Sequence, residues 1–153
     1  MTNKKILIIG GNGFIGKNLA STLVKRKDFD VYSFDLALPK TEMENVKYLE
    51  GDFFDEHVLK NAISGMDLII HSLSTVNPGN SNEKYMQGYG RDFMQTIRLC
   101  KMLIDQNSGM IFLSSGGTVY GVQEEQPIKE TALPVPINHY GSVKLCIENV
   151  IRT

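Results

Sequence analysis

The chain has 153 residues and a formal net charge of −1, with 16 Lys and Arg against 17 Asp and Glu. This length suffices for one domain with a real core, and the lack of a basic run argues against a nucleic-acid partner. No apolar run is long enough to span a bilayer, so we expect no membrane partner. Two cysteines, Cys100 and Cys146, fit reduced thiols in a cytoplasmic protein better than a disulfide or a metal site.

Apolar runs of strand length alternate with helical patterns along the chain. This alternation predicts an α/β protein with a doubly wound parallel sheet and helices on both faces. We expect five strands, over residues 5–9, 31–34, 46–49, 67–71 and 110–113. We expect helices over residues 14–26 and 56–63, a longer helix after the polar loop 72–82, and a last helix that begins near Asn138, which could cap it.

Helical periodicity also predicts which faces of two helices are buried. The first helix should bury Ile15, Leu19 and Leu23. The longer helix should bury Phe93, Ile97, Cys100 and Ile104.

The first strand runs directly into a glycine-rich segment, Gly10-Gly11-Asn12-Gly13-Phe14-Ile15-Gly16. An aliphatic strand before it and an apolar-periodic helix after it are the context in which such a fingerprint binds a dinucleotide. Glycine lets the backbone approach a pyrophosphate, and the helix N-terminus offers free N–H groups to the anion. We therefore predict a dinucleotide site; the alternative is a tight turn that binds nothing. Its expected contacts are Gly10, Gly13, Phe14, Ile15 and Gly16.

Aspartates follow the second and third strands. Asp35 lies 19 residues after Gly16, where a carboxylate accepts hydrogen bonds from an adenosine ribose and repels a 2′-phosphate, so NAD is favoured over NADP. Asp52 and Phe53 lie at the carboxyl edge of the sheet, where they could meet the adenine. The alternative for both aspartates is an ordinary role in a turn.

His71 ends the fourth strand, and Leu73 and Ser74 follow it. No third ligand is spaced for a metal, so we expect no metal site and interpret His71 as a packed residue near the cofactor. Leu73 and Ser74 are expected to contact the cofactor.

Hydroxyl side chains gather after the fifth strand, in the segment 114–121. Hydroxyls at the carboxyl end of a strand can hydrogen-bond a substrate alcohol or carbonyl. Ser115 and Thr118 are the candidates, and the alternative is a Ser/Gly turn that binds nothing.

Tyr140 and Lys144 lie one helical turn apart on the same face of the last helix. A nearby cation stabilises a phenolate and should lower the pKa of Tyr140 from its usual ~10. Tyr140 could then act as a base or an acid near neutral pH. The pattern alone is common in exposed helices, but it gains weight from the glycine loop and the serine-rich strand end.

Taken together, these motifs resemble the extended short-chain dehydrogenase/reductase superfamily, in its NAD-dependent epimerase/dehydratase branch. The glycine loop, Asp35, Gly51-Asp52, His71, the segment 114–121 and the Tyr140–Lys144 pair occur in family order over essentially the whole chain. Within the branch, the ending Thr-Val-Tyr-Gly at residues 118–121 looks most like the UDP-glucose 4-epimerase group. The resemblance implies a Rossmann domain that binds NAD and a nucleotide sugar, with a UDP-hexose favoured.

The resemblance also implies a mechanism. Tyr140 would take the proton from the sugar 4-hydroxyl while a hydride leaves C4 for the nicotinamide, giving a 4-keto sugar. Lys144 would hold the nicotinamide ribose and lower the Tyr140 pKa. The keto sugar would turn over and receive the hydride on its other face, and the full-length protein would be a homodimer.

Two positions depart from the family pattern. Gly116 stands where the family usually places its catalytic Ser or Thr, so that role should pass to Ser115 or to Thr118, with Ser115 preferred. Asp92 stands on the long helix where an Asn is common. Neither change affects Tyr140 or Lys144.

Members of the family are roughly twice this length, and the pattern of the last helix continues to Thr153 without a helix-stop signal. We therefore expect residues 1–153 to be an incomplete NAD-binding Rossmann domain, truncated before the substrate domain and inactive alone. A dehydratase or sugar reductase of the same family is an alternative, although Gly117 and Thr118 replace the Asp-Glu usual in dehydratases. A non-catalytic NAD-binding regulatory module is a second alternative, and retention of Tyr140 and Lys144 argues against it.

Overall fold

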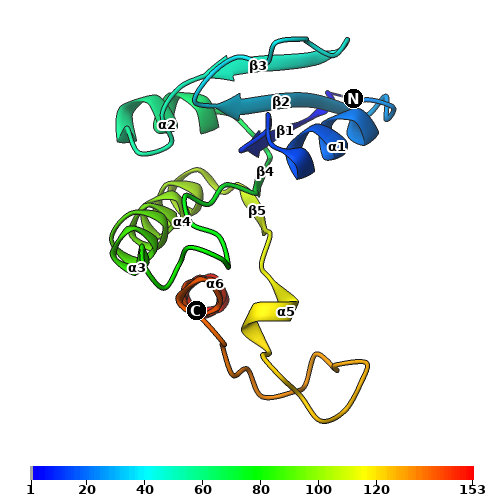
Figure 1. Cartoon of the computed structure of the whole chain (residues 1–153). Coiled ribbons are helices and arrows are strands. Elements are labelled where there is room, and N and C mark those ends of the chain that lie inside the picture. The colour runs from blue at the N-terminus through cyan, green and yellow to red at the C-terminus, as the bar shows by residue number, and fades with distance from the viewer. Residues whose placement is uncertain (1) are drawn as a thin grey trace. The chain divides into compact units, whose positions relative to one another are not determined.

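The computed structural model describes residues 2–153. Its strands form one parallel sheet in the order β3-β2-β1-β4-β5 (Figure 1). The strands are β1 (Lys4–Ile9), β2 (Phe29–Asp35), β3 (Val46–Glu50), β4 (Leu68–His71) and β5 (Gly109–Phe112). This order is that of a doubly wound sheet, so the predicted α/β fold class is confirmed.

The strand order reverses at β1, whose last residue Ile9 pairs with Phe34 of β2 on one side and His71 of β4 on the other. The loops after β1 and β4 therefore leave the sheet at its topological switch point. Ligands of open α/β sheets bind at this point, so the position of the glycine loop agrees with the predicted dinucleotide site.

Helix α1 (Phe14–Leu23) ends three residues before the predicted boundary at residue 26. Leu19 and Leu23 pack against the aliphatic cluster of β1, β2 and β4, as predicted. The prediction for Ile15 was wrong, because its side chain is 52% exposed and Gly16 is buried instead. Gly16 faces the backbone of the glycine loop, and its neighbour Ile15, about 100° away around the helix, points outward.

The long helical stretch consists of α3 (Tyr85–Gln87), the π-helical segment η1 (Gly88–Phe93) and α4 (Met94–Gln106). Its buried side chains include polar ones: Asp92, Gln95, Thr96, Leu99 and Leu103. Of the predicted face, Phe93, Ile97 and Cys100 are partly buried, and the prediction was wrong for Ile104, which is 79% exposed. Apolar periodicity could not detect a face whose buried members include a carboxylate, an amide and a hydroxyl.

Three further helices complete the fold. Helix α2 (Glu56–Ile63) has the predicted bounds, α5 (Gly116–Val119) is a single turn, and α6 covers His139–Arg152. Asn138 caps α6 as predicted, since its Oδ1 accepts from Gly141 N at 2.8 Å. Within residues 2–153, no helix combines the length and the apolar character needed to cross a bilayer.

The chain divides into two compact units. The sheet unit comprises the residues up to Leu73 together with Lys101–Leu113 and contains all five strands. The helical unit comprises Ser74–Cys100 together with Ser114–Thr153 and contains η1, α5 and α6.

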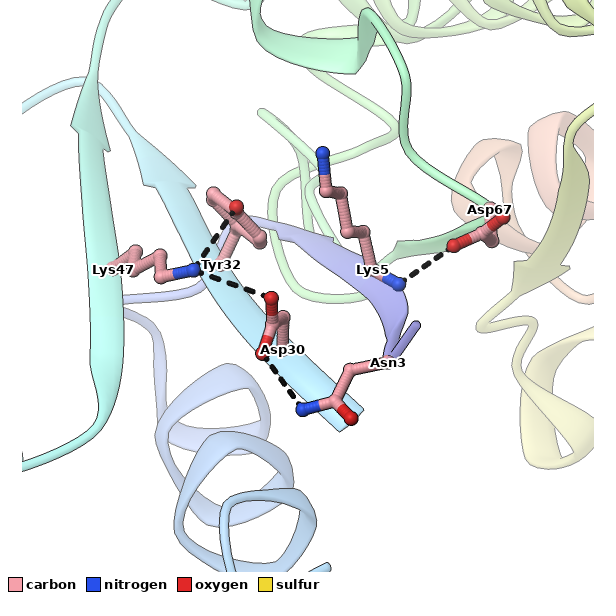
Figure 2. A network of polar contacts seen from close by, with 6 residues as sticks. All are labelled: Asn3, Lys5, Asp30, Tyr32, Lys47 and Asp67. Atoms are coloured by element: carbon pink, nitrogen blue, oxygen red, sulfur yellow. Dashed lines mark hydrogen bonds and ion pairs between the residues drawn. The ribbon is translucent and has the colours of Figure 1, made fainter. Parts of the chain in front are cut away.

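A polar network joins the amino ends of the strands in the sheet unit, at the edge opposite the glycine loop (Figure 2). Asp30 accepts from Asn3 Nδ2 at 3.1 Å and from Lys47 Nζ at 3.4 Å. Lys5 N donates to Asp67 Oδ2 at 2.7 Å. Solvent-exposed ion pairs such as Lys47–Asp30 contribute little to stability, so this edge is aligned mainly by the backbone ladder.

Candidate functional site

The glycine loop turns back tightly onto the start of α1. Gly10 has φ +77°, in the left-handed region that glycine tolerates best. A Cβ added to Gly16 would lie 2.4 Å from Gly10 O and 2.6 Å from Gly11 Cα. Glycine is therefore required at both positions by the shape of the loop itself.

The N-terminus of α1 is open to an anion. Its N-cap residue, Gly13, makes no side-chain capping bond, and the first turn holds no acidic residue. The first N–H groups of a helix have no partner inside the helix, and they carry a partial positive charge. The backbone at Phe14 and Ile15 is thus suited to a phosphate, while the Phe14 side chain is 85% exposed.

Asp35 is tied to this loop at the end of β2. Its Oδ2 accepts from Asn12 N at 2.9 Å and its Oδ1 from Leu36 N at 2.8 Å. The Asn12 side chain accepts from Ser33 Oγ and donates to Ala37 O. The structure therefore brings Asp35 and the glycine loop together, through an asparagine to which the sequence analysis gave no separate role.

The residues after β3 have different environments. Asp52 is exposed and accepts from Phe54 N at 2.9 Å, which is an ordinary turn bond. The Phe53 ring is 2% exposed and lies 5.1 Å from the ring of His71. His71 also lies 5.6 Å from the Phe112 ring, so its packed position is as predicted. Phe53 can therefore meet a ligand only through its backbone.

Leu73 and Ser74 lie in different units. A Cβ added to Gly10 would lie 3.1 Å from Leu73 N, so Leu73 adjoins the glycine loop. Ser74 belongs to the helical unit, where its Oγ lies 2.9 Å from both Val76 O and Asp92 Oδ2 and can donate its one hydrogen to either. The Ser74 hydroxyl thus serves the environment of Asp92.

In the helical unit, α6 presents Tyr140 and Lys144 to each other. Lys144 Nζ lies 5.4 Å from the centroid of the Tyr140 ring. The Lys144 side chain is buried, at 4% exposure, and Tyr140 is partly buried. The pair is therefore not an exposed helix pair, which was the alternative.

Burial and a neighbouring carboxylate shift the acidity of both groups. Burial lowers the pKa of Lys144 to about 8, against an opposing effect of Asp92. Burial raises the pKa of Tyr140 above its usual 10, and the negative charge of Asp92 raises it further. The Tyr140 pKa is therefore raised rather than lowered in this structure, because burial and the Asp92 charge both disfavour the phenolate.

The three hydroxyls after β5 are not equivalent. Ser114 Oγ donates to Glu148 Oε1, and Thr118 Oγ1, which is buried, donates to Ser115 O. Among residues 2–153, Ser115 Oγ makes no hydrogen bond, and its side chain is partly exposed. Ser115 is thus the hydroxyl of the three that remains available to a ligand. A Cβ added to Gly116 would meet nothing within 4 Å, so space does not exclude a side chain there.

Metal-ligating side chains do not gather anywhere in the part of the chain that the structure describes. No group of three or more His, Cys, Asp or Glu side chains there could hold a metal ion. Both cysteines are free and partly buried.

Comparison with known proteins gives consistent matches. The sequence model of the NAD dependent epimerase/dehydratase family matches residues 6–153. The GDP-6-deoxy-D-talose 4-dehydrogenase of Aggregatibacter actinomycetemcomitans is 30% identical over 151 residues, which cover 97% of this chain and 47% of that protein. The UDP-glucose 4-epimerase of Streptococcus mutans is 26% identical over 153 residues, covering 96% and 46%.

A solved structure agrees with these matches. The UDP-glucose 4-epimerase of Bifidobacterium longum, solved in complex with NAD+ and UDP, is 31% identical with a TM-score of 0.86. The match covers 97% of this chain and 48% of that one. The chain thus spans about half the length of the relatives it matches.

Proposed function

The chain belongs to the NAD-dependent epimerase/dehydratase family, and on this premise we propose that it supplies the cofactor-binding and acid/base part of a nucleotide-sugar 4-epimerase. The observation that carries the proposal is the Tyr140–Lys144 pair, in which a buried ammonium lies beside a partly buried phenol. A regulatory module that only binds NAD needs neither group. The proposed substrate is a UDP-hexose, since related 4-epimerases act on UDP-sugars.

The sheet unit fits NAD. The glycine loop and the open N-terminus of α1 suit the pyrophosphate, with Gly10, Gly13, Phe14, Ile15 and Gly16 as the proposed contacts. Asp35 retains acceptor capacity for a ribose hydroxyl. Asp52, the Phe53 backbone and Leu73 are further proposed contacts in this unit, and Ser74 of the helical unit is another. When bound, NAD supplies a reversible hydride acceptor.

The proposed acid/base work lies with α6 and the segment after β5. Tyr140 exchanges a proton with the sugar O4 as this position passes between alcohol and ketone. Lys144 supplies the positive charge that favours the phenolate. Ser115 hydrogen-bonds the same oxygen, in place of the side chain that Gly116 lacks, and Thr118 is the second candidate for this role.

A sugar 4-dehydrogenase or reductase is the second candidate, favoured by two observations. A 4-dehydrogenase is 30% identical to this chain. Burial and the Asp92 charge raise the pKa of Tyr140, which favours the protonated phenol that would donate to a 4-keto oxygen. A dehydratase is less favoured because Gly117 and Thr118 replace its usual acidic pair.

The test is an activity assay of the protein, isolated from its natural source, with a panel of UDP-, GDP- and dTDP-sugars. An epimerase interconverts two sugars with no net change in NADH, whereas a dehydrogenase produces or consumes NADH. We expect Tyr140→Phe to lower turnover by about 10²–10⁴-fold while NAD binding persists. Tyr32→Phe, in the polar network of Figure 2, is the matched control and should retain activity. Unchanged turnover in Tyr140→Phe would remove Tyr140 from the acid/base role, and no turnover of any sugar by the unmodified protein would support the regulatory module.

Three further features are part of the proposal. The 153 residues alone should not turn over a sugar, which the same panel checks. The complete protein should be a cytoplasmic homodimer. The partly exposed apolar side chains of Phe93 and Ile97, in the helical unit, support a self-association surface, and sedimentation measures the oligomeric state.

A further inference from the structure

The helical unit contains a buried carboxylate that the proposed mechanism does not use. Asp92 lies in η1 and is 4% exposed. Burying a charged carboxylate is strongly unfavourable unless the group is paired or hydrogen-bonded. Asp92 therefore requires a physical explanation, and its position in a π-helical segment is one where functional residues often occur.

Hydrogen bonds from one short segment fix the position of this carboxylate. Asp92 Oδ2 accepts from Ser74 Oγ at 2.9 Å and from Thr75 N at 2.7 Å. Its Oδ1 accepts from Thr75 Oγ1 at 2.6 Å. Both oxygens act as acceptors, the pattern of an ionised carboxylate. The negative charge thus has a defined place within the helical unit.

Helix α6, which carries Tyr140 and Lys144, packs against η1, which carries Asp92. Lys144 is as deeply buried as Asp92, and Asp92 opposes the effect of burial on the pKa of Lys144. The same carboxylate raises the pKa of Tyr140. An ammonium buried without a counter-charge would lose its proton more readily, and the pair would lose its cation.

We propose that Asp92 is a positioning residue for the reaction assigned above: its buried carboxylate, held by Ser74 and Thr75, is the fixed counter-charge of the buried Lys144 ammonium. The catalytic relevance of this role depends on the proposed function, but the charge pairing itself does not. Asp92 touches neither substrate nor cofactor in this role and acts through Lys144.

Other titratable groups lie on the elements next to the Asp92 carboxylate. Helix α6 packs against η1 and α5. On η1, Tyr89 OH lies 3.3 Å from His139 Nδ1, and Arg91 is exposed. On α6, Glu148 bonds Ser114 and Arg152. The turn α5 carries no titratable side chain.

The test separates the charge of Asp92 from its shape. Asp92→Asn keeps the size, and its amide can still bond Ser74 and Thr75, because a hydroxyl both donates and accepts. The titration of Lys144 is followed in the full chain through its Nζ and Cε NMR resonances, assigned with Lys144→Met. We expect the midpoint of Lys144 to fall by about one pH unit or more and that of Tyr140 to fall as well.

The control is Thr75→Val, which removes one hydroxyl donor but leaves the charge of Asp92 in place. Its Lys144 midpoint should stay close to that of the unmodified chain. An Asp92→Asn midpoint equal to that of Thr75→Val would overturn the proposal. The titration needs no turnover, so its failure is distinguishable from failure of the epimerase proposal, which Tyr140→Phe decides.

A second measurement covers the case in which Asp92→Asn does not fold. The same substitution is made in the Lys144→Met background, where the ammonium is absent. If Asp92 acts as a counter-charge, the loss of stability caused by Asp92→Asn shrinks in this background. An equal loss, or failure to fold in both backgrounds, would show that Asp92 only shapes the segment at Ser74 and Thr75.

Discussion

The sheet unit and the helical unit bury different kinds of group. The sheet unit buries aliphatic strands, such as β1 from Ile6 to Ile9, at 2% exposure or less, and its proposed ligand groups are backbone N–H groups and the partly exposed Asp35. The helical unit buries a carboxylate and an ammonium, Asp92 and Lys144, whereas the ionisable side chain buried in the sheet unit is the imidazole of His71. The difference shows that backbone geometry forms the proposed cofactor site, whereas the burial of charged groups determines the pKa values of the proposed acid/base pair.

The largest effect is expected in the sheet unit, from the substitution Gly16→Ala. Its Cβ would lie 2.4 Å from Gly10 O, a backbone atom that cannot move without opening the loop. We expect a stability loss of about 3 kcal/mol and no detectable NAD binding, measured by denaturant unfolding and calorimetry. Gly90→Ala is the control, since its Cβ would meet nothing within 4 Å; equal NAD binding in the two variants would refute the requirement for glycine.

The next largest effect is expected from the buried Lys144 ammonium of the helical unit, on the pH dependence of the unfolding free energy. Its pKa of about 8, against 10.5 ordinarily, means that the unfolded chain binds one proton more between these values. Stability should therefore rise with pH across this window, by about 3 kcal/mol in total. The measurement is the difference in unfolding free energy between the unmodified chain and Lys144→Met at pH values from 7 to about 11. A difference that stays constant with pH would contradict the burial of a charged Lys144.

Asp35 tests whether the sheet unit selects its cofactor by charge. Loss of hydrogen bonds to a carboxylate is worth about 1.5–3 kcal/mol, so Asp35→Asn should weaken NAD binding by roughly 10–100-fold. Its discrimination against NADP should also fall, because a 2′-phosphate is no longer repelled. Asp30→Asn, at the opposite end of the same strand, is the control. Unaltered affinity ratios in Asp35→Asn would remove Asp35 from the site.

The smallest effects on stability are expected from the loss of a helix cap, and each unit provides one such cap for comparison. Asn138 caps α6, and Asp55 caps α2 by accepting from His57 N and Val58 N. Replacing either by Ala should lower stability by about 1 kcal/mol. Only Asn138→Ala should also reduce turnover, because α6 carries Tyr140. Equal turnover in the two variants would show that the start of α6 does not position the acid/base pair.

Sequence reasoning predicted what depends on local spacing. The glycine loop, the cap at Asn138 and the shared face of Tyr140 and Lys144 follow from helix and turn geometry over a few residues. The sequence-based predictions were wrong where burial determines the exposure or the pKa of a side chain. Helical periodicity predicts a core position for Ile104, but its side chain is 79% exposed. The pKa of Tyr140 is raised although the Lys144 ammonium lies beside its ring.

The sequence by itself determined the family, the order of the strands and helices, and which residue types stand at the proposed site, because these are properties of spacing along one chain. Only the tertiary structure decided that the Phe53 ring belongs to the core and that no residue among 2–153 hydrogen-bonds the Ser115 hydroxyl. It also decided that Lys144 is buried on a helix that packs against η1, which carries Asp92. These outcomes depend on desolvation and on contacts between segments such as Ser74–Thr75 and η1, which lie 17 or 18 residues apart along the chain.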